Sequence, residues 1–479
     1  MHRHPSYCLL SFSPLPPFTP ALLLAPTDCQ LLESCSTATD CGAGLYCGNC
    51  PSLGKTQPFC IRGQATIPTS IISGLPFNKY SWLMTHNAFS IVDAPSLTGA
   101  QRITFYNQED SVTNQLRNGV RGFMLDMYDF ENDIWLCHSF RGQCYNFTAF
   151  EPAINTLREI EAFLTQNPSE IVTIIIEDYV HTPKGLTRVF TDSGLDKYWY
   201  PVAKMPKKGE DWPTVNSMVQ NNYRLLVFTS DSSKEATEGI AYQWRYMVEN
   251  EPGDPGVVPG SCPNRKESKP LNSRSASLFL MNYFPTIPVQ NEACKEHSTP
   301  LADMVATCYK SAGNQMPNFL AVNFYMRSDG GGVFDYLDRM NGQTLCGCST
   351  ISACQPGAPF GSCRPVTPAN TTPTATGTGG SFTGSVQLTG DASATNILGM
   401  PHREPFIVQQ HSFGLYLKSR TDRQQANEAG SRYSHSPYID RLEFVAFIHK
   451  NKKTFLSNMR TTPQDDRLDT ESKATVSVK

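Results

Sequence analysis

The chain has 479 residues, of which 17% are charged, and its formal net charge is −3. This balance excludes a nucleic-acid-binding protein that relies on a broad basic surface, and it excludes an acidic disordered chain. Hydrophobic residues make up 39% of the sequence, and no run of them approaches the roughly 18 apolar residues of a membrane span.

The two ends of the chain differ in composition from its middle. Residues 1–26 have a basic start and an apolar stretch, but we expect only a poor signal peptide because prolines interrupt it. Residues 364–390 are rich in Thr, Ser, Gly and Pro and carry almost no charge, which predicts an extended stalk. Residues 391–479 change character again, and we expect a divergent, mostly disordered tail.

The sixteen cysteines are more than a cytosolic chain usually carries without metal-finger spacing. Six of them fall between Cys29 and Cys60, and four more fall between Cys346 and Cys363. We therefore expect a small disulfide-rich segment over residues 27–63, a second one over residues 346–363, and an oxidising, extracellular environment.

Two further cysteine pairs refine this expectation. Cys137 and Cys144 are close enough in sequence to close a short loop by a disulfide. Cys47 and Cys50 form a CxxC pair, so a zinc site is the alternative for the first segment. A second CxxC at zinc-ribbon spacing is missing, which favours disulfides.

Between residues 64 and 345, apolar runs alternate with helical patterns. The continuous run Ile171–Ile176 is typical of a parallel strand that is covered on both faces. Helices are predicted over Phe150–Asn167, Lys184–Ser193 and Gly332–Met340. Strands are predicted over Ser81–His86, Val120–Met127, Ile134–His138, Ile171–Asp178, Arg224–Thr229, Leu278–Phe284 and Phe319–Arg327. This alternation predicts an α/β protein with a distorted (β/α) barrel of the TIM type. A doubly wound open sheet is the alternative, but no GxGxxG follows the first strand.

Polar residues at the carboxyl ends of the predicted strands are the candidates for chemistry, because barrel enzymes place their sites there. The first and third strands end in His86 and His138, and two histidines can serve as a base and an acid. Asp126 and Glu177 close the second and fourth strands. A lone histidine at a strand end is more often structural, but two of them beside carboxylates favour a site.

Four segments, taken in order, resemble the X-domain of phosphatidylinositol-specific phospholipases C. They are Met84–Asn87, Gly119–Asp129, Leu136–Ser139 and Ile174–Asp178. The resemblance covers about residues 65–345 and implies the barrel fold of that family. The run from Cys35 through the Thr-rich stalk is similar to the plant secreted PLC-like phosphodiesterases.

This resemblance implies a mechanism with two histidines. His86 matches the general base that takes a proton from the inositol 2-hydroxyl, which attacks phosphorus and forms a cyclic phosphate. His138 matches the general acid that protonates the departing glycerol oxygen. Arg141, which follows a predicted strand, and Asn323 and Tyr325, which lie toward the end of the last predicted strand, are the expected substrate-binding residues.

The resemblance also implies a cation that stabilises charge at phosphorus. Eukaryotic relatives use calcium, and Asn87, Asp126 and Glu177 match three of their ligands. Met124 stands where another acid is expected, and thioether sulfur is not a ligand that calcium prefers. Bacterial relatives use an Arg near the position of Asp126 instead of the metal. We therefore expect at most a weak calcium site.

The function expected from these observations is a secreted phosphoric diester hydrolase. Its substrate would be a phosphoinositol lipid or a glycerophosphodiester, with contact to a membrane surface and none to nucleic acid. The sequons at Asn146 and Asn370 fit an extracellular or cell-surface glycoprotein. Plant relatives often carry a GPI signal, but no apolar tail follows the stalk here. The alternatives are an extracellular barrel that binds ligand or cell-wall polymer after decay of the site at Met124, and a structural wall glycoprotein.

Overall fold

The computed structural model describes residues 28–365. The expected signal peptide, the tail and nearly all of the stalk therefore lie outside the described residues. All described residues belong to one compact unit. Within residues 28–365, every helix is too short or too polar to cross a membrane.

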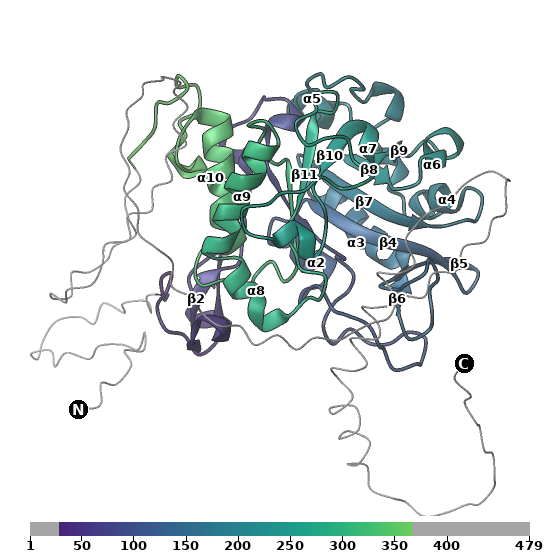
Figure 1. Cartoon of the computed structure of the whole chain (residues 1–479), viewed down its shortest axis with the longest axis horizontal. Helices are drawn as coiled ribbons and strands as arrows, with labels where there is room; N and C mark the ends of the chain where they lie inside the picture. Colours follow the sequence, from purple (N-terminus) through teal and green to yellow (C-terminus); the bar gives the residue numbers. More distant parts are fainter. Residues whose placement is uncertain (1–27, 366–479) are drawn as a thin grey trace, which may run out of the picture. The chain divides into compact units, whose positions relative to one another are not determined.

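Eight parallel strands form a curled sheet at the centre of this unit (Figure 1). Their order around the sheet follows the chain, and the last of them, β12, pairs with the first, β3. This order confirms the predicted distorted (β/α) barrel, because a doubly wound sheet would reverse its strand order. The strands are β3 (Trp82–Thr85), β4 (Gly122–Phe130), β7 (Val172–Tyr179), β8 (Leu225–Thr229), β9 (Ala241–Tyr242), β10 (Met247–Glu249), β11 (Leu278–Asn282) and β12 (Phe319–Val322).

The barrel is not closed between β9 and β10, which are the two edges of the sheet. The short helix α7 (Gln243–Tyr246) joins these edge strands in sequence and lies between them (Figure 1). Both edge strands have only two or three residues, and the sequence analysis missed them because so short a run carries no clear period.

The predicted strand Ile134–His138 exists but is not a barrel strand, which corrects its place in the predicted series. It is β5 (Asp133–Cys137), which runs antiparallel to β4 and pairs on its other side with β6 (Ala149–Pro152). Glu131 and Asn132 join β4 to β5 and have positive φ angles of 50° and 61°. A two-residue turn with this backbone reverses the chain into a hairpin. The apolar pattern predicts a strand but does not give its direction.

The three predicted helices are present. They are α3 (Ala153–Gln166), α4 (Gly185–Asp192) and α10 (Gly332–Cys346). α3 ends just before Asn167, because the residue ahead of Pro168 disfavours the helical conformation. The other helices are α1 (Pro68–Ile71), α2 (Val112–Arg117), α5 (Val215–Gln220), α6 (Ser233–Thr237), α8 (Gln290–Glu296) and α9 (Thr299–Ser311).

Alternate residues of the barrel strands face two different cores. On β7, Ile174 and Ile176 pack in the cluster between strands and helices, whereas Ile175 packs in the cluster inside the barrel. Since successive side chains point to opposite faces, Glu177 also faces the interior. On β4, Met124 packs against the inner cluster, so Asp126 faces the interior as well.

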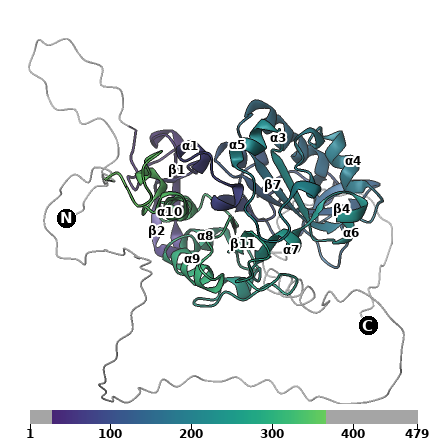
Figure 2. The same cartoon turned by 90° about the horizontal axis from the view of Figure 1, so that it is seen from above.

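The cysteine-rich segment forms a β-hairpin of β1 (Leu45–Cys50) and β2 (Lys55–Arg62). Figures 1 and 2 show it beside α8, and the Cys50–Cys294 disulfide joins the two. The expected disulfides are thus confirmed, but the hairpin is not self-contained. The other disulfides in the described residues are Cys35–Cys47, Cys41–Cys60, Cys137–Cys144, Cys262–Cys308, Cys346–Cys354 and Cys348–Cys363.

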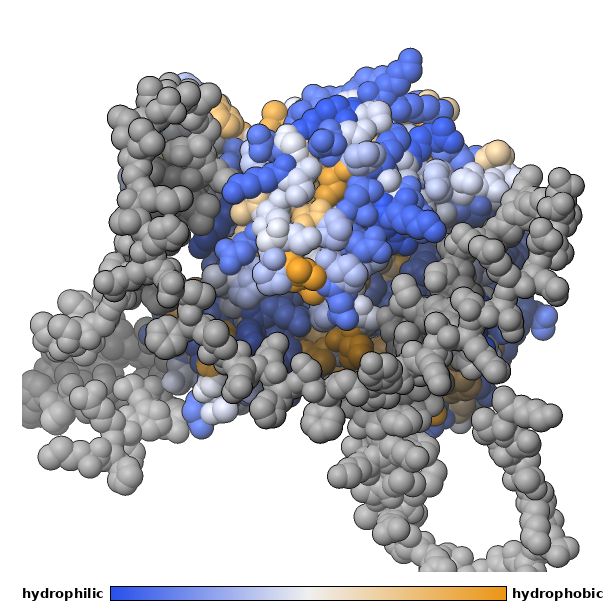
Figure 3. Space-filling model, viewed as in Figure 1, coloured by the Kyte–Doolittle hydropathy of each residue, from blue (hydrophilic) through white to orange (hydrophobic). Residues whose placement is uncertain are grey.

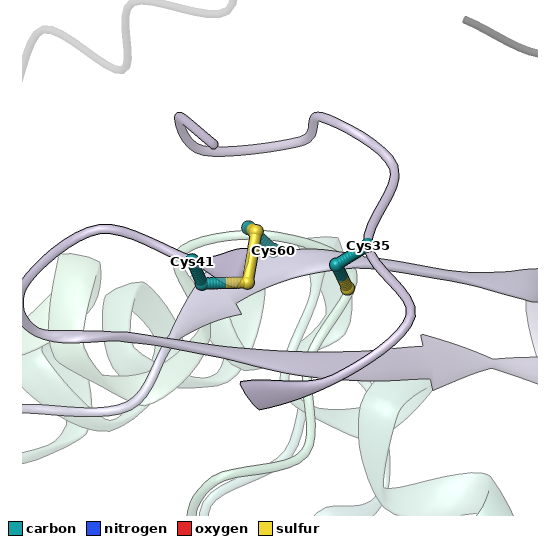
Figure 4. A group of neighbouring side chains, drawn as sticks. All are labelled: Cys35, Cys41 and Cys60. Atoms are coloured by element: carbon teal, nitrogen blue, oxygen red, sulfur yellow. A yellow bond between two sulfur atoms is a disulfide. The ribbon is translucent and has the colours of Figure 1, made fainter. Parts of the chain in front are cut away.

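The sulfur atoms of Cys35, Cys41 and Cys60 lie within 4.8 Å of one another, which is close enough to share a metal ion. Figure 4 shows instead that Cys41 is bonded to Cys60. Cys35 is bonded to Cys47, which lies outside this group. Zinc requires thiolates, and a sulfur atom in a disulfide is not one. The hairpin is therefore held by disulfides rather than by zinc.

Candidate active site

A small pocket lies at the carboxyl ends of the barrel strands. Its walls come from the ends of β3, β4, β7, β8 and β10, from α7, and from the loop that follows β10. It brings together three of the predicted site residues, His86, Asp126 and Glu177. A pocket at this end of a (β/α) barrel is where such proteins place their chemistry.

His86 follows β3, and its ring is held on three sides. Its Nδ1 lies 2.9 Å from Oδ1 of Asn323, and the amide of Asn107 lies 3.2 Å from the same nitrogen. Asn107 also donates to Asn323 Oδ1 at 3.0 Å, which keeps that oxygen turned toward the imidazole. The ring stacks on Phe284 with 3.7 Å between centroids and 4° between planes. With Nδ1–H donating to Asn323, the neutral ring presents the lone pair of Nε2.

The surroundings of His86 favour its neutral form. Burial lowers its pKa to about 3, and the charges of His138 and Arg265 add to that effect. The hydrogen bond to Asn323 opposes the shift but does not cancel it. A neutral imidazole is the form that accepts a proton, so this residue is suited to be a base.

His138 follows the hairpin strand β5, and the hairpin returns it to the same end of the barrel. Its backbone N–H donates to the carbonyl of Thr148 at 3.2 Å, and its Nδ1 lies 3.1 Å from the carbonyl of Phe105. Burial lowers the pKa of His138, while the bond to Phe105 and the charge of Glu177 oppose that shift. The charge of Glu177 thus acts on His138, whereas the charge of Arg265 acts on His86.

Asp126 and Glu177 are direct neighbours across the β4–β7 ladder and both line the pocket. Burial raises the pKa of Asp126 well above its ordinary value of 3.8, and the charge of Glu177 raises it further. Asp126 is buried, whereas the side chain of Glu177 is exposed, so burial disfavours the charged form of Asp126. Glu177 also accepts a hydrogen bond from the hydroxyl of Tyr179.

The predicted calcium ligands do not form a complete set of oxygen donors. Asn87 is buried and its Oδ1 has no hydrogen-bond partner in residues 28–365, yet it does not line the pocket with Asp126 and Glu177. Met124 lines the pocket with a thioether. Calcium prefers six to eight oxygen ligands, so this set does not fit a tight calcium site.

The three predicted substrate-binding residues lie in different places. Asn323 contacts His86, as described above. The Tyr325 hydroxyl donates to Asp110 at 2.6 Å and accepts from Asn118 at 2.9 Å, and Tyr325 does not line the pocket. Arg141 is exposed in the loop that the Cys137–Cys144 disulfide closes. A substrate-binding role for these residues stays a prediction.

Sequence reasoning missed Arg265 and Glu249, which line the pocket beside His86. Glu249 ends the three-residue strand β10, which is too short for its period to be noticed. Arg265 lies in an irregular loop, where no local signal marks it. Phe284 closes a predicted strand, but an apolar side chain gives no sign of a stacking role.

Comparison with known proteins identifies the family of this chain. The PI-PLC X domain family, described as PI-PLC X 1, matches residues 90–337, which include His138, Asp126 and Glu177. A PI-PLC X domain-containing protein of Arabidopsis thaliana is 74% identical over 366 residues, or 75% of this chain and 86% of that protein. The chain therefore belongs to the PI-PLC X domain family, as the four sequence segments predicted.

More distant relatives cover less of the chain. An uncharacterised secreted protein of Arthroderma benhamiae is 26% identical over 273 residues, which are 52% of this chain and 60% of that protein. A phosphatidylinositol-specific phospholipase C structure from Staphylococcus aureus matches 57% of this chain and 95% of its own at 12% identity, with a TM-score of 0.35. One from Listeria monocytogenes matches 52% and 90% at 15% identity, with a TM-score of 0.36.

Proposed function

We propose that this protein is a phosphoric diester hydrolase that cleaves a phosphoinositol or glycerophosphodiester bond with a pair of histidines. One observation carries the proposal. His138 does not itself line the pocket, but its charge acts on His86, which does, and each histidine has its Nδ1 held by a carbonyl oxygen. Both rings therefore have Nε2 left for a reacting group. The local charges favour His86 as the base and His138 as the acid.

In the proposed reaction, Nε2 of His86 takes the proton of the inositol 2-hydroxyl while that oxygen attacks phosphorus. The bond from phosphorus to the glycerol oxygen breaks as the new bond forms, and His138 gives its proton to the departing oxygen. The products are a cyclic inositol phosphate and an alcohol, which is diacylglycerol if the substrate is a lipid. One proton is gained by His86 and one is lost by His138, and hydrolysis of the cyclic phosphate with the roles reversed restores both.

The proposed reaction also needs a positive group that stabilises the negative charge at phosphorus. Weak calcium binding at Asp126 and Glu177 remains part of the proposal, but no step above depends on it. Both carboxyl groups line the pocket, where they would also repel an anionic phosphodiester. A positive group is therefore required near phosphorus.

An extracellular location and contact with a lipid surface complete the proposal. Seven disulfides within the described residues are typical of a secreted protein. The exposed side chains of Leu97, Val258 and Val289 lie in loops that follow β3, β10 and β11, at the same end of the barrel as the pocket. On the face seen in Figure 3, hydrophobic residues form small separate patches among hydrophilic ones. A few apolar side chains around a pocket suit transient contact with lipid.

The test is a phosphodiesterase assay of the purified chain on phosphatidylinositol vesicles and on soluble glycerophosphoinositol. His86→Ala and His138→Ala should each lower the rate by about 10²–10⁴-fold. His181→Ala, which changes an exposed histidine, is the matched control. Turnover at the wild-type level in His86→Ala or His138→Ala would remove that histidine from the mechanism.

The alternative is a binding protein without turnover, which Met124 in place of an acid favours. That reading predicts no cleavage of either substrate by the wild-type chain, together with saturable binding of inositol 1-phosphate. A wild-type rate that depends on His86 and His138 would reject it.

A further inference from the structure

The pocket contains a cation that belongs to the chain itself. Arg265 is the one Lys or Arg among the residues that line the pocket in the described part of the chain. Its guanidinium is close enough to His86 and to Glu177 for their charges to act on one another. The side chain is 22% exposed, so the pocket can bring solvent or a ligand to it.

A buried carboxylate holds this guanidinium in place. Glu249 has a fully buried side chain, and its Oε1 accepts from Nη1 of Arg265 at 3.1 Å. The carboxylate also accepts from Asn282 at 2.8 Å, from Gln243 at 2.8 Å and from Trp244 Nε1 at 2.6 Å. These donors come from β11, which is the neighbour of β10, and from α7, so both elements determine the position of Glu249.

Two further contacts, with Trp244 and Glu267, also constrain the guanidinium of Arg265. Its carbon atom lies 5.0 Å from the ring centroid of Trp244, and its Nε donates to Glu267 at 3.1 Å. Nη2 has no hydrogen-bond partner within residues 28–365. Nη2 of this fixed guanidinium is thus left to donate to a ligand, and a hydrogen bond from arginine to a phosphate oxygen is strengthened by the opposite charges.

The electrostatics agree with a phosphate-binding role. Burial lowers the pKa of Arg265, but the charges of Glu249 and Glu177 more than offset this, so its pKa is raised and it stays charged. The pocket otherwise presents Glu177 and Asp126 to an incoming anion. A preorganised donor in such a place stabilises charge that develops during the reaction and needs no reorganisation.

We propose that Arg265, held by Glu249, binds the non-bridging oxygens of the substrate phosphate and replaces a metal ion as the stabilising cation. This inference rests on the proposed phosphodiesterase function and names the residue that recognises the phosphate. The helix α7, which lies in the gap between β9 and β10, contributes to this site because it supplies two of the hydrogen-bond donors that hold Glu249.

The experiment compares the wild-type chain with Arg265→Ala in the presence of EDTA. With glycerophosphoinositol as substrate, kcat/KM of the variant should fall by about 10²–10³-fold. Arg245→Ala is the matched control, because Arg245 lies on α7 and pairs with Glu235 outside the pocket. Guanidinium ion at millimolar concentration should restore part of the rate to Arg265→Ala, whereas the same concentration of sodium chloride should not.

Loss of Arg265 leaves Glu249 as a buried charge without its partner, so the variant must be shown to fold. The double variant Arg265→Ala/Glu249→Gln removes both charges and should also be slow, and thermal unfolding of each variant reports its fold. A folded Arg265→Ala or double variant with the wild-type rate would overturn the inference. A wild-type chain that is active with calcium and inactive in EDTA would overturn it as well.

A wild-type chain without activity under any condition would count against the proposed function instead. Calorimetric binding of inositol 1-phosphate then still tests Arg265. Binding by the wild type that is lost in the folded Arg265→Ala variant would support a phosphate site. Equal binding by both proteins would overturn it.

Discussion

At the scale of single residues, His86 and His138 have the same side chain but different surroundings. Burial lowers the pKa of His86, which is stacked on Phe284, and the positive charges of His138 and Arg265 lower that pKa further. His138 instead lies near the negative charge of Glu177, which raises its pKa against the effect of burial. Pairs of groups whose surroundings separate their pKa values are the usual basis for assigning an acid and a base.

This difference predicts the pH dependence of the reaction. The base His86 must be neutral, which holds above about pH 3, and the acid His138 must be protonated, which holds below its own pKa. Because burial lowers that pKa from 6.5, kcat/KM should be highest below pH 6.5 and should fall as the pH rises further. Initial rates on glycerophosphoinositol between pH 4 and pH 8 measure this.

The variant Glu177→Gln sharpens the same test. Removal of the negative charge that raises the pKa of His138 should move the alkaline limb of the profile to lower pH. A profile that stays flat or rises from pH 5.5 to pH 8 in the wild-type chain would show that no histidine with a lowered pKa acts as the acid.

Met124 provides a test of the calcium proposal. Met124→Glu adds a third carboxylate beside Asp126 and Glu177 and should tighten calcium binding from the roughly 10⁻⁴–10⁻³ M range that weak extracellular sites show. Met124→Gln has the same size without the charge and is the control. Calorimetric titration with calcium compares the three proteins, and equal affinities for both variants would mean that calcium does not bind at this pocket.

At the scale of elements, the β1–β2 hairpin depends on the barrel as well as on its own disulfides. Cys50 of β1 is bonded to Cys294 of α8, and the Tyr46 hydroxyl donates to the carbonyl of Met326 at 2.8 Å. A segment of this size buries too little apolar surface to fold alone. The contact with α8 therefore fixes its place as well as its shape.

The length of the loop that the Cys50–Cys294 disulfide closes predicts how much this disulfide stabilises the folded protein. Cys50–Cys294 spans 244 residues in sequence, whereas Cys346–Cys354, which is buried to a similar degree, spans 8. In the chain-entropy account, replacing the first pair by serine should cost about 3 kcal/mol more than replacing the second. Urea unfolding of the two double variants measures the free energies. A larger loss for Cys346→Ser/Cys354→Ser would show that local packing, rather than loop closure, governs both bonds.

At the scale of the whole molecule, the end of the barrel that holds the pocket also carries exposed apolar side chains. Replacing Leu97, Val258 and Val289 together by serine should weaken binding to phosphatidylinositol vesicles, because each exposed apolar side chain contributes to partitioning into lipid. Hydrolysis of soluble glycerophosphoinositol should not change, since none of the three lines the pocket. Vesicle sedimentation and the soluble assay separate the two effects. Unchanged sedimentation would exclude these loops from lipid contact.

Some of the site could be predicted from the sequence, because short-range rules determine it. Apolar runs locate the strands, and the parallel arrangement brings their carboxyl ends to one edge, so His86, Asp126 and Glu177 were expected to meet and they line one pocket. The family could be predicted for the same reason, since its motifs are these strand ends. Clustered cysteines likewise predicted the disulfides that close short loops, such as Cys137–Cys144.

Features that depend on partners far apart in the chain could be determined only from the tertiary structure. The bond between Cys50 and Cys294 spans 244 residues, and no local pattern encodes it. β5 required the turn at Glu131 and Asn132 to set its direction. Arg265 reaches the pocket only because Glu249, at the end of a three-residue strand, is held by α7 and β11. A hydrophobic period reports which face of a strand is buried, but it carries no information about which distant side chain completes a charge pair.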